Sequence, residues 1–346
     1  ATDAMLAEHG PANLPIPLIP PLVLVICIAC VAGAAALLHC ALAAAIIKRT
    51  RNGLCCLILQ LAVADFILLT TSVGPEVWIT NARTWGFGRS ICVTFRGLTV
   101  LTSSASLYLV VTIALHTLAT INLEEKITAQ SKRSTIIDDE SRSSRHSLVA
   151  NSDTSTPPRT MNVDYRFSTD SKVPIVPPSF FVWFLSASLS IPEFALATVR
   201  QDRDLIVCDL VESSHTFNIH SMLALFNFFI PVFIMSTACI LVAFKLRTKH
   251  FRKNDKQSVP ALKLSLSLII VYFIMCFPRS LLHFYGIYFN NDAENLLNED
   301  NLFLIVNLIC SGLYLGSTIL RPFLCIAILP RIRKKFTFGS KNIVEV

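Results

Sequence analysis

Residues 21–47 read PLVLVICIACVAGAAALLHCALAAAII, and this stretch decides the fold class. It contains no acidic residue, lysine or arginine. A membrane-spanning helix needs about 20 consecutive, mostly apolar residues. The prolines up to Pro21 set the expected start, because proline is tolerated in the first turn of a helix but not in its interior. The stretch therefore predicts one membrane helix over residues 21–47.

Six further stretches have a similar length and apolar character, at residues 54–80, 89–121, 175–199, 217–247, 260–288 and 301–329. The composition of the 346 residues agrees, since 53% are hydrophobic and 15% are charged, against about 25% charged residues in soluble domains. These values exclude a soluble enzyme, a disordered chain and a secreted disulfide scaffold. We predict an all-α membrane protein, a seven-transmembrane helix bundle with a short amphipathic C-terminal helix beyond Pro330.

The distribution of charge predicts the orientation of this bundle. Short loops rich in Lys and Arg stay in the cytoplasm. Basic residues follow the first, fifth and seventh spans, whereas residues 1–20 carry none and the 289–300 loop is purely acidic. We expect an extracellular tail over 1–20, a cytoplasmic tail over 330–346 and a plasma-membrane location. The net charge of +7 then reflects orientation and contact with membrane lipids, not nucleic-acid binding.

Residues 122–174 separate transmembrane helices 1–3, within 21–121, from helices 4–7, within 175–329. This segment is rich in Ser, Thr and charged residues, and it has too little apolar surface to fold alone. It is therefore expected to be a disordered cytoplasmic insertion. A more specific alternative is a phosphorylation platform, because SKRS, SRSS and SRHS place serines beside basic residues.

Several motifs narrow the family. LAVADF surrounds Asp65, the run Trp85-Gly86-Phe87-Gly88 precedes Cys92, and prolines lie inside the last three spans, at Pro231, Pro278 and Pro322. Together these resemble the rhodopsin-like (class A) G-protein-coupled receptors. The resemblance implies a disulfide between Cys92 and Cys208, which fits their expected position at the oxidising exterior.

Asp65 is the most informative residue, because a carboxylate near mid-membrane is costly without a partner. In the family this aspartate binds a sodium ion with a serine on span 3, which Ser106 matches. The family's span-7 asparagine is replaced by Arg321, directly before Pro322. Our hypothesis is a buried switch pair in which Arg321 binds Asp65 in place of sodium. The alternative is that Arg321 extends to the cytoplasmic face.

The activation motifs of the family are degenerate here. The Asp/Glu-Arg-Tyr triplet is replaced by His116, Thr117 and Leu118. Cys276 replaces the tryptophan before Pro278, and Cys325 replaces the tyrosine after Pro322. The outer half of the family pattern is kept, while the inner switch residues are changed. Coupling to a heterotrimeric G protein or arrestin is therefore left open.

The candidate ligand-binding residues are Glu76, Arg96, Thr99, Arg279 and His283. Thr99 stands where amine receptors of the family carry an aspartate, so an amine ligand is disfavoured. The two arginines suit a carboxylate or phosphate, unless Glu76 or Glu193 neutralises them. Acidic residues expected around the mouth would steer a cationic ligand inward; they are Asp202, Asp204, Asp209, Glu212, Asp292, Glu294, Glu299 and Asp300.

The predicted function is that of a G-protein-coupled receptor for an extracellular ligand, with a peptide favoured because it can carry both basic groups and a carboxylate. The alternative is a heptahelical scaffold, scavenger or modulator of another receptor that does not couple to G proteins. No catalytic sequence motif of the G-x-S-x-G, H-E-x-x-H or P-loop type occurs, so neither enzymatic activity nor a cofactor or metal site is expected.

Overall fold

The computed structural model describes residues 20–47, 52–82, 84–145, 173–202, 205–211, 216–250, 258–289, 301–330 and 332–333. The chain begins with helices α1 (Pro21–Ile47), α2 (Gly53–Ala82), α3 (Gly88–Arg145) and α5 (Val176–Leu196). A hairpin of β1 (Ala197–Asp202) and β2 (Leu205–Leu210) follows. Two further helical segments each contain a π-helical turn. The first consists of α6 (Thr216–Ala224), η1 (Leu225–Phe229) and α7 (Ile230–His250). The second consists of α8 (Ser258–Val271), η2 (Tyr272–Cys276) and α9 (Phe277–Phe289). The last helix is α10 (Asn301–Ile328).

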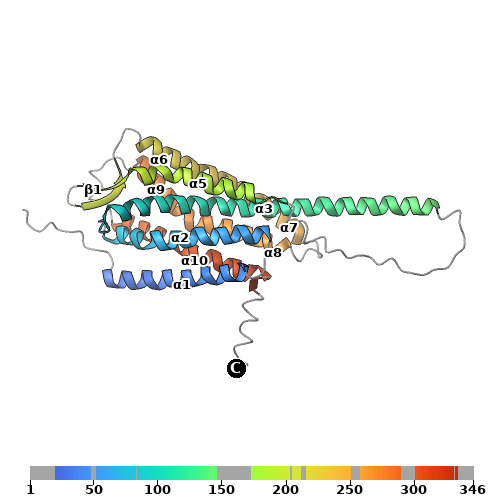
Figure 1. Ribbon diagram of the computed structural model, residues 1–346, viewed down its shortest axis with the longest axis horizontal. Coiled ribbons are helices and arrows are strands. Elements are labelled where there is room, and N and C mark those ends of the chain that lie inside the picture. Colours follow the sequence, from blue (N-terminus) through green and yellow to red (C-terminus); the bar gives the residue numbers. More distant parts are fainter. Residues whose placement is uncertain are drawn as a thin grey trace, which may run out of the picture.

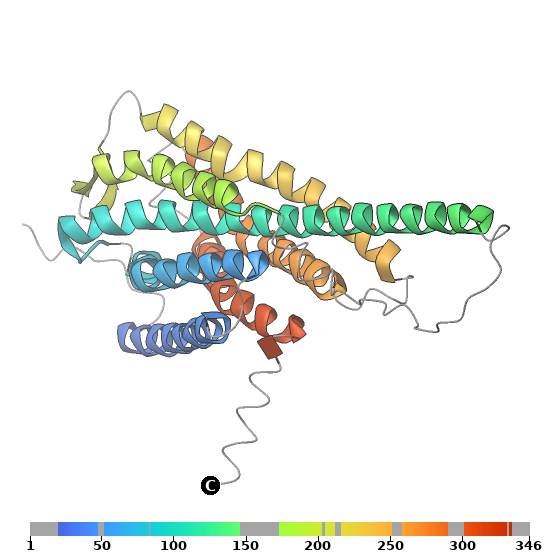
Figure 2. The same cartoon turned by 45° about the vertical axis from the view of Figure 1, so that its right-hand side comes forward.

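Within the described residues, seven helices are long and apolar enough to cross a membrane. They lie side by side in one bundle, with the β1–β2 hairpin at one end (Figures 1 and 2). The predicted all-α, seven-transmembrane fold is therefore confirmed, and the chain is a multi-pass membrane protein. We call the end with the hairpin the disulfide end and the opposite end the far end.

Helix α3 occupies the centre of the bundle. It contacts α2, α5, α7, α8 and β1, whereas α1 contacts α2 and α10 at the periphery. Leu109, Ile113 and Ala114 of α3 are fully buried. By contrast, Phe180, Phe181 and Phe184 of α5 are exposed, as expected for side chains whose surroundings in a membrane are lipid tails.

Helix α3 is longer than predicted, and it extends well beyond the other helices at the far end (Figures 1 and 2). The sequence predicts an end at residue 121, but the helix continues to Arg145. No proline or glycine interrupts residues 122–145, and Glu125 binds Lys245 of α7 at 2.6 Å. Residues 146–172 lie outside the described part, as do 334–346 of the predicted C-terminal helix, of which Ile332 and Arg333 are helical.

The two π-helical turns each end two residues before a proline. The N–H of Ile230 bonds to the carbonyl of Leu225, and the N–H of Phe277 bonds to that of Tyr272. Proline has no N–H, and its ring clashes with the preceding turn of an α-helix, so a wider turn before Pro231 and Pro278 relieves the clash. Both turns border the cavity described next.

Candidate functional site

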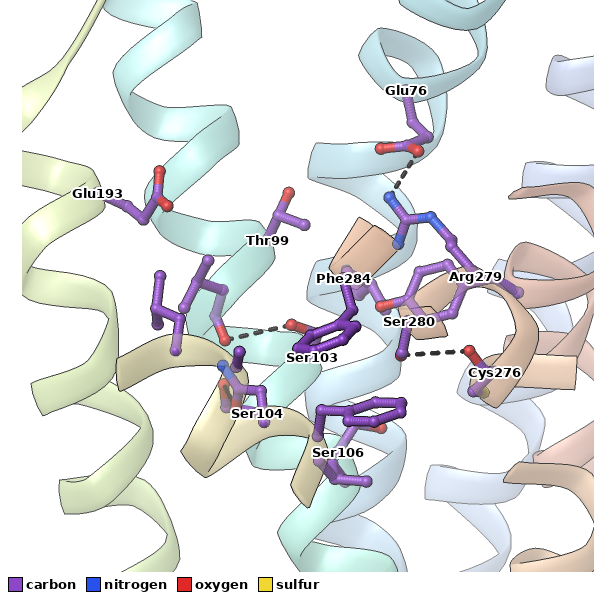
Figure 3. A pocket seen from close by; sticks show the side chains of 18 of the residues that line it. Glu76, Thr99, Ser103, Ser104, Ser106, Glu193, Cys276, Arg279, Ser280 and Phe284 are labelled. Atoms are coloured by element: carbon purple, nitrogen blue, oxygen red, sulfur yellow. Dashed lines mark hydrogen bonds and ion pairs between the residues drawn. The ribbon is translucent and has the colours of Figure 1, made fainter. Parts of the chain in front are cut away.

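A cavity of about 240 Å³ lies inside the bundle. Side chains of α3, η1, η2, α9 and α10 line most of it, and α2, α5 and α6 complete the wall. Figure 3 shows Glu193 on one side, Glu76 with Arg279 on the other, and Ser106 at the bottom of the view. The cavity therefore extends from charged groups near the disulfide end to the middle of the membrane spans.

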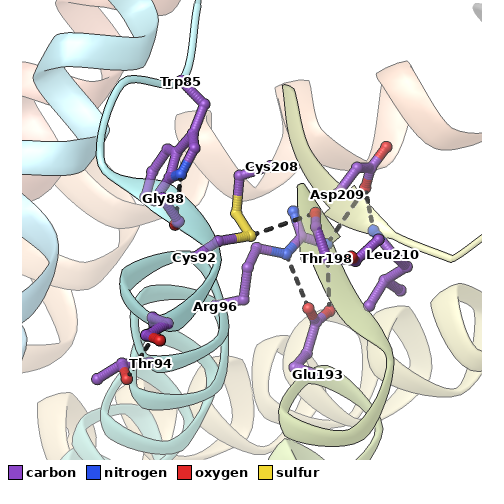
Figure 4. The surroundings of a disulfide bond; sticks show 11 residues. Trp85, Gly88, Cys92, Thr94, Arg96, Glu193, Thr198, Cys208, Asp209 and Leu210 are labelled. Atoms are coloured by element: carbon purple, nitrogen blue, oxygen red, sulfur yellow. Dashed lines mark hydrogen bonds and ion pairs between the residues drawn. A yellow bond between two sulfur atoms is a disulfide. The ribbon is translucent and has the colours of Figure 1, made fainter. Parts of the chain in front are cut away.

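The disulfide end is held by a bond between Cys92 and Cys208, which confirms the predicted disulfide. Cys208 lies on β2 opposite Val199 of β1, so the bond attaches the hairpin to the start of α3 (Figure 4). The backbone N–H of Trp85 donates to the carbonyl of Ile206, and its indole N–H donates to the carbonyl of Gly88. Gly88 has a φ of 79°, a left-handed conformation that glycine adopts without strain.

The hairpin side of the cavity carries an ion pair between helices. Nε of Arg96 on α3 lies 2.8 Å from Oε2 of Glu193 on α5. Arg96 also lies 3.7 Å from Asp209 of β2 (Figure 4). Glu193 is nearly inaccessible, and Arg96 is the cation that lies against it.

The opposite wall carries a second ion pair. Nη2 of Arg279 on α9 lies 2.5 Å from Oε1 of Glu76 on α2 (Figure 3). Ser311 of α10 donates to the same oxygen at 3.4 Å, and the guanidinium lies 4.4 Å from the centre of the Tyr314 ring. Both candidate arginines therefore have a carboxylate partner in this state, so an anionic ligand group would have to exchange with it.

The other candidate ligand contacts differ in position. Thr99 lines the cavity and shares a hydrogen bond of 2.6 Å with Ser72 of α2. The side chain of His283 lies outside the described residues. Among the predicted acidic residues of the mouth, Asp209 is described and binds Arg96, whereas the side chains of the others are outside the described part.

The floor of the cavity brings together Asp65, Ser106 and Arg321. Nη1 of Arg321 lies 2.7 Å from Oδ1 of Asp65 and 2.6 Å from Oγ of Ser106, which itself donates to Asp65. The side chains of Arg321 and Asp65 are 5% and 1% exposed. Nη2 of Arg321 adds a bond of 3.2 Å to Sγ of Cys276. A single guanidinium on α10 thus links α2, α3 and η2, rather than extending to the far end.

The degenerate activation residues lie at the far end or within the core. Ser265 of α8 donates to Oγ1 of Thr117 at 3.1 Å, which gives α3 and α8 a neutral connection. His116 is buried beside Thr117, and Leu118 packs against an apolar cluster that includes Val242. Pro278 belongs to α9, and both Pro322 and Cys325 of α10 are buried.

Other residues of the site were not among the candidates. Tyr272, Tyr314 and Asn227 line the cavity, and Ser104 donates to Oδ1 of Asn227 at 2.7 Å. Phe228 stacks on Phe277 and Phe284 at ring distances of 5.4 and 5.7 Å, forming an aromatic wall. Their polar and aromatic side chains within apolar spans were a sequence signal by which these residues could have been found. The π-helical turns, however, shift which side chains face inward.

Chemically, the arrangement is suited to binding. Within the described chain, no group of three His, Cys, Asp or Glu side chains is placed to hold a metal ion. The cavity instead combines ion pairs, hydroxyl groups and an aromatic wall, as expected for a site that orients a ligand by a few polar contacts.

Comparison with known proteins agrees with this architecture. The family model "7 transmembrane receptor (rhodopsin family)" matches residues 168–323, which include α5 to α9 and most of α10. A search of curated proteins gave no match. The predicted resemblance is confirmed over residues 168–323, where the chain matches the rhodopsin family of seven-transmembrane receptors, and the described residues contain seven helices long and apolar enough to cross a membrane.

Proposed function

We propose that this chain is a plasma-membrane receptor, with its N-terminus outside, that binds an extracellular peptide in the cavity. The observation that carries the proposal is the set of ion pairs around one cavity between helices. Such charges are costly inside a membrane, and they are expected where function requires them. Because the disulfide end would face the extracellular side, a ligand would reach the cavity beside the hairpin.

The charge balance supports a peptide ligand. Three arginines line the cavity, and the described ion pairs join them to four carboxylates: Arg96 with Glu193 and Asp209, Arg279 with Glu76, and Arg321 with Asp65. These groups have one excess negative charge. A peptide with free termini and one basic residue has one excess positive charge and one carboxylate, so it could neutralise the site while exchanging partners with the ion pairs.

We propose that the Asp65–Arg321 pair is the switch that responds to this ligand. The pair joins helices at the cavity floor, the wider turn η2 contacts it through Cys276, and the turn η1 lines the same cavity. A ligand changes a conformational equilibrium by binding one state better than the other. Rearrangement at the floor would then move α7 and α8 relative to α3 at the far end, where a G protein or arrestin would bind.

A second function is favoured by the far end itself. His116, Thr117 and Leu118 provide no arginine for a G protein, and Thr117 is bound to Ser265. A heptahelical scaffold, scavenger or receptor modulator would need no such arginine. The two proposals share the ligand cavity and differ in what the far end does.

The test uses the intact chain in lipid nanodiscs with purified heterotrimeric G proteins. A library of short peptides, each with one basic residue and a free C-terminal carboxylate, is screened for binding and then for nucleotide exchange. Binding that weakens in Glu193→Gln and Arg279→Gln, together with exchange above that of empty nanodiscs, supports the receptor. Binding without exchange for any G-protein class favours the scaffold. Failure of every peptide to bind contradicts the peptide assignment.

A further inference from the structure

Near the floor of the cavity, three hydrogen-bond donors and one acceptor, Oδ2 of Asp65, make no hydrogen bond to any described residue. The hydroxyl groups of Tyr272 and Tyr314 and the Nε–H of Arg321 are buried and make no hydrogen bond to any described residue. All three side chains line the same cavity. The hydroxyl of Ser280 lies near that of Tyr272; it donates to the carbonyl of Cys276 at 3.3 Å and keeps lone pairs that can accept, so the Tyr272 O–H can turn either to Ser280 or to the cavity.

Unpaired buried donors are costly, and a charged donor costs more than a neutral one. Three of the four other N–H donors of Arg321 are used, since Nη1 binds Asp65 and Ser106, and Nη2 makes one bond to Cys276. These bonds fix the guanidinium while its Nε–H remains available. The two tyrosines come from different elements, η2 and α10, and each interacts electrostatically with Arg321. Three donors from η2 and α10 therefore line the same cavity.

We infer that this floor is a small-anion subsite, in which Arg321, Tyr314 and Tyr272 bind a carboxylate of the ligand or a free anion such as chloride. An ionised carboxylate accepts hydrogen bonds and donates none, so it matches a set of unpaired donors. A charge-assisted bond to a guanidinium is stronger than a neutral bond. The ligand-carboxylate form of this inference rests on the receptor function proposed above.

Occupation of the subsite would act directly on the switch pair. An anion at Nε of Arg321 competes with Asp65 for the same positive charge, and it repels that carboxylate. The anion therefore weakens the bond of 2.7 Å between α2 and α10. By reciprocity, a change that removes the competing charge of Asp65 while Arg321 is kept strengthens anion binding. Binding of an anion deep in the cavity would thereby be coupled to the contact between α2 and α10.

The test uses the purified intact chain in nanodiscs and N-acetyl-arginine as the probe. N-acetyl-arginine amide is the control, because a neutral amide replaces the carboxylate. Thermal unfolding is followed against probe concentration, because a ligand that binds the folded state raises the midpoint in a saturable way. A third series replaces a bulky sulfonate anion with chloride at constant ionic strength. We expect the free acid to stabilise the chain and the amide to have a weaker effect.

The variants separate the subsite from general stability. Tyr314→Phe and Tyr272→Phe remove one donor each, and each should weaken binding of the free acid about tenfold, the loss expected for a hydrogen bond to a charged group. Tyr108→Phe is the matched control, because the Tyr108 hydroxyl donates to the carbonyl of Phe226 and does not line the cavity. Tyr108→Phe should lower the thermal unfolding midpoint that is measured in the absence of the probe, but it should leave the affinity for the probe unchanged. Asp65→Asn should raise that affinity.

Each outcome decides between the sources of the anion. Saturable stabilisation by the free acid that both tyrosine variants weaken assigns the subsite to a ligand carboxylate. The same loss in the chloride series assigns it to a free anion. If the acid and the amide raise the unfolding midpoint equally and chloride has no saturable effect, the subsite is contradicted. The three donors would then be hydrated instead. If library peptides drive nucleotide exchange equally well as acids and amides, the receptor proposal stands and the ligand-carboxylate form of this inference falls.

Discussion

Three arginines inside the bundle each lie against a carboxylate from another element, and this pairing explains how a membrane interior holds so many charges. An unpaired charge at such depth would cost several kcal/mol. The sequence identified the arginines and their possible partners Asp65, Glu76 and Glu193. It could not decide whether the outer pairs form, because that depends on side-chain geometry across helices that are distant in sequence.

At the same scale, Gly97 predicts a tight contact between α3 and α5. A Cβ added at Gly97 would overlap the ring of Phe194, whereas one added at Gly312 of α10 would meet no atom within 4 Å. Gly97→Ala should therefore destabilise the chain by about 1–3 kcal/mol, as overpacking does. Gly312→Ala should be neutral or stabilising by up to about 1 kcal/mol, because alanine favours a helix. Both effects are measured as the free energy of unfolding in mixed micelles.

The tight-contact interpretation has a direct counter-test. Combining Gly97→Ala with Phe194→Ala should restore part of the lost stability, since the smaller side chain makes room for the added methyl group. If the two substitutions instead destabilise the chain additively, the contact between Gly97 and Phe194 is not what limits the packing of these helices.

At the scale of elements, the seven spans could be predicted to within a few residues, apart from the end of α3. A long apolar stretch is sufficient for that, because a membrane permits little else. The inward-facing residues were harder. Each π-helical turn, η1 or η2, closes its backbone hydrogen bond over one residue more than an α-helical turn. This changes which side chains face inward, and Tyr272 and Asn227 line the cavity. The prolines after these turns predict a distorted helix, but they do not predict that the distortion is a π-helical turn.

The disulfide gives an element-scale prediction. The Cys92–Cys208 bond joins α3 to the β1–β2 hairpin at the disulfide end. Replacing both cysteines by alanine should lower stability by about 2–5 kcal/mol, and it should weaken binding of any ligand that contacts Arg96, since Asp209 lies beside Cys208 on the same strand. Thermal unfolding with and without reductant measures the first effect.

The control is Cys30→Ala, because Cys30 of α1 is an exposed free cysteine. It should leave the unfolding midpoint and its response to reductant unchanged. A double variant of Cys92 and Cys208 that unfolds at the same temperature as the parent chain would contradict a stabilising role for the bond.

At the scale of the whole molecule, the orientation in the membrane rests on the distribution of Lys and Arg. We expect an N-glycosylation sequon introduced within residues 1–15 to be glycosylated in cells, and one introduced within residues 150–165 to remain unmodified. The measurement is the shift in electrophoretic mobility that glycosidase treatment reverses. Modification of the second site alone would reverse the proposed topology, and with it the direction from which a ligand enters.

We expect the buried Asp65–Arg321 pair to hold α2 and α10 together. A double-mutant cycle with Asp65→Asn and Arg321→Gln, read as the free energy of unfolding, tests it most directly. Each single change should cost about 3–5 kcal/mol because it leaves a buried charge alone, and the double variant should lose much less than the sum. The half-exposed pair Glu125–Lys245 is the control, where single changes should cost about 0–1 kcal/mol. Strictly additive losses at Asp65 and Arg321, or losses no larger than those of the control pair, would contradict the account.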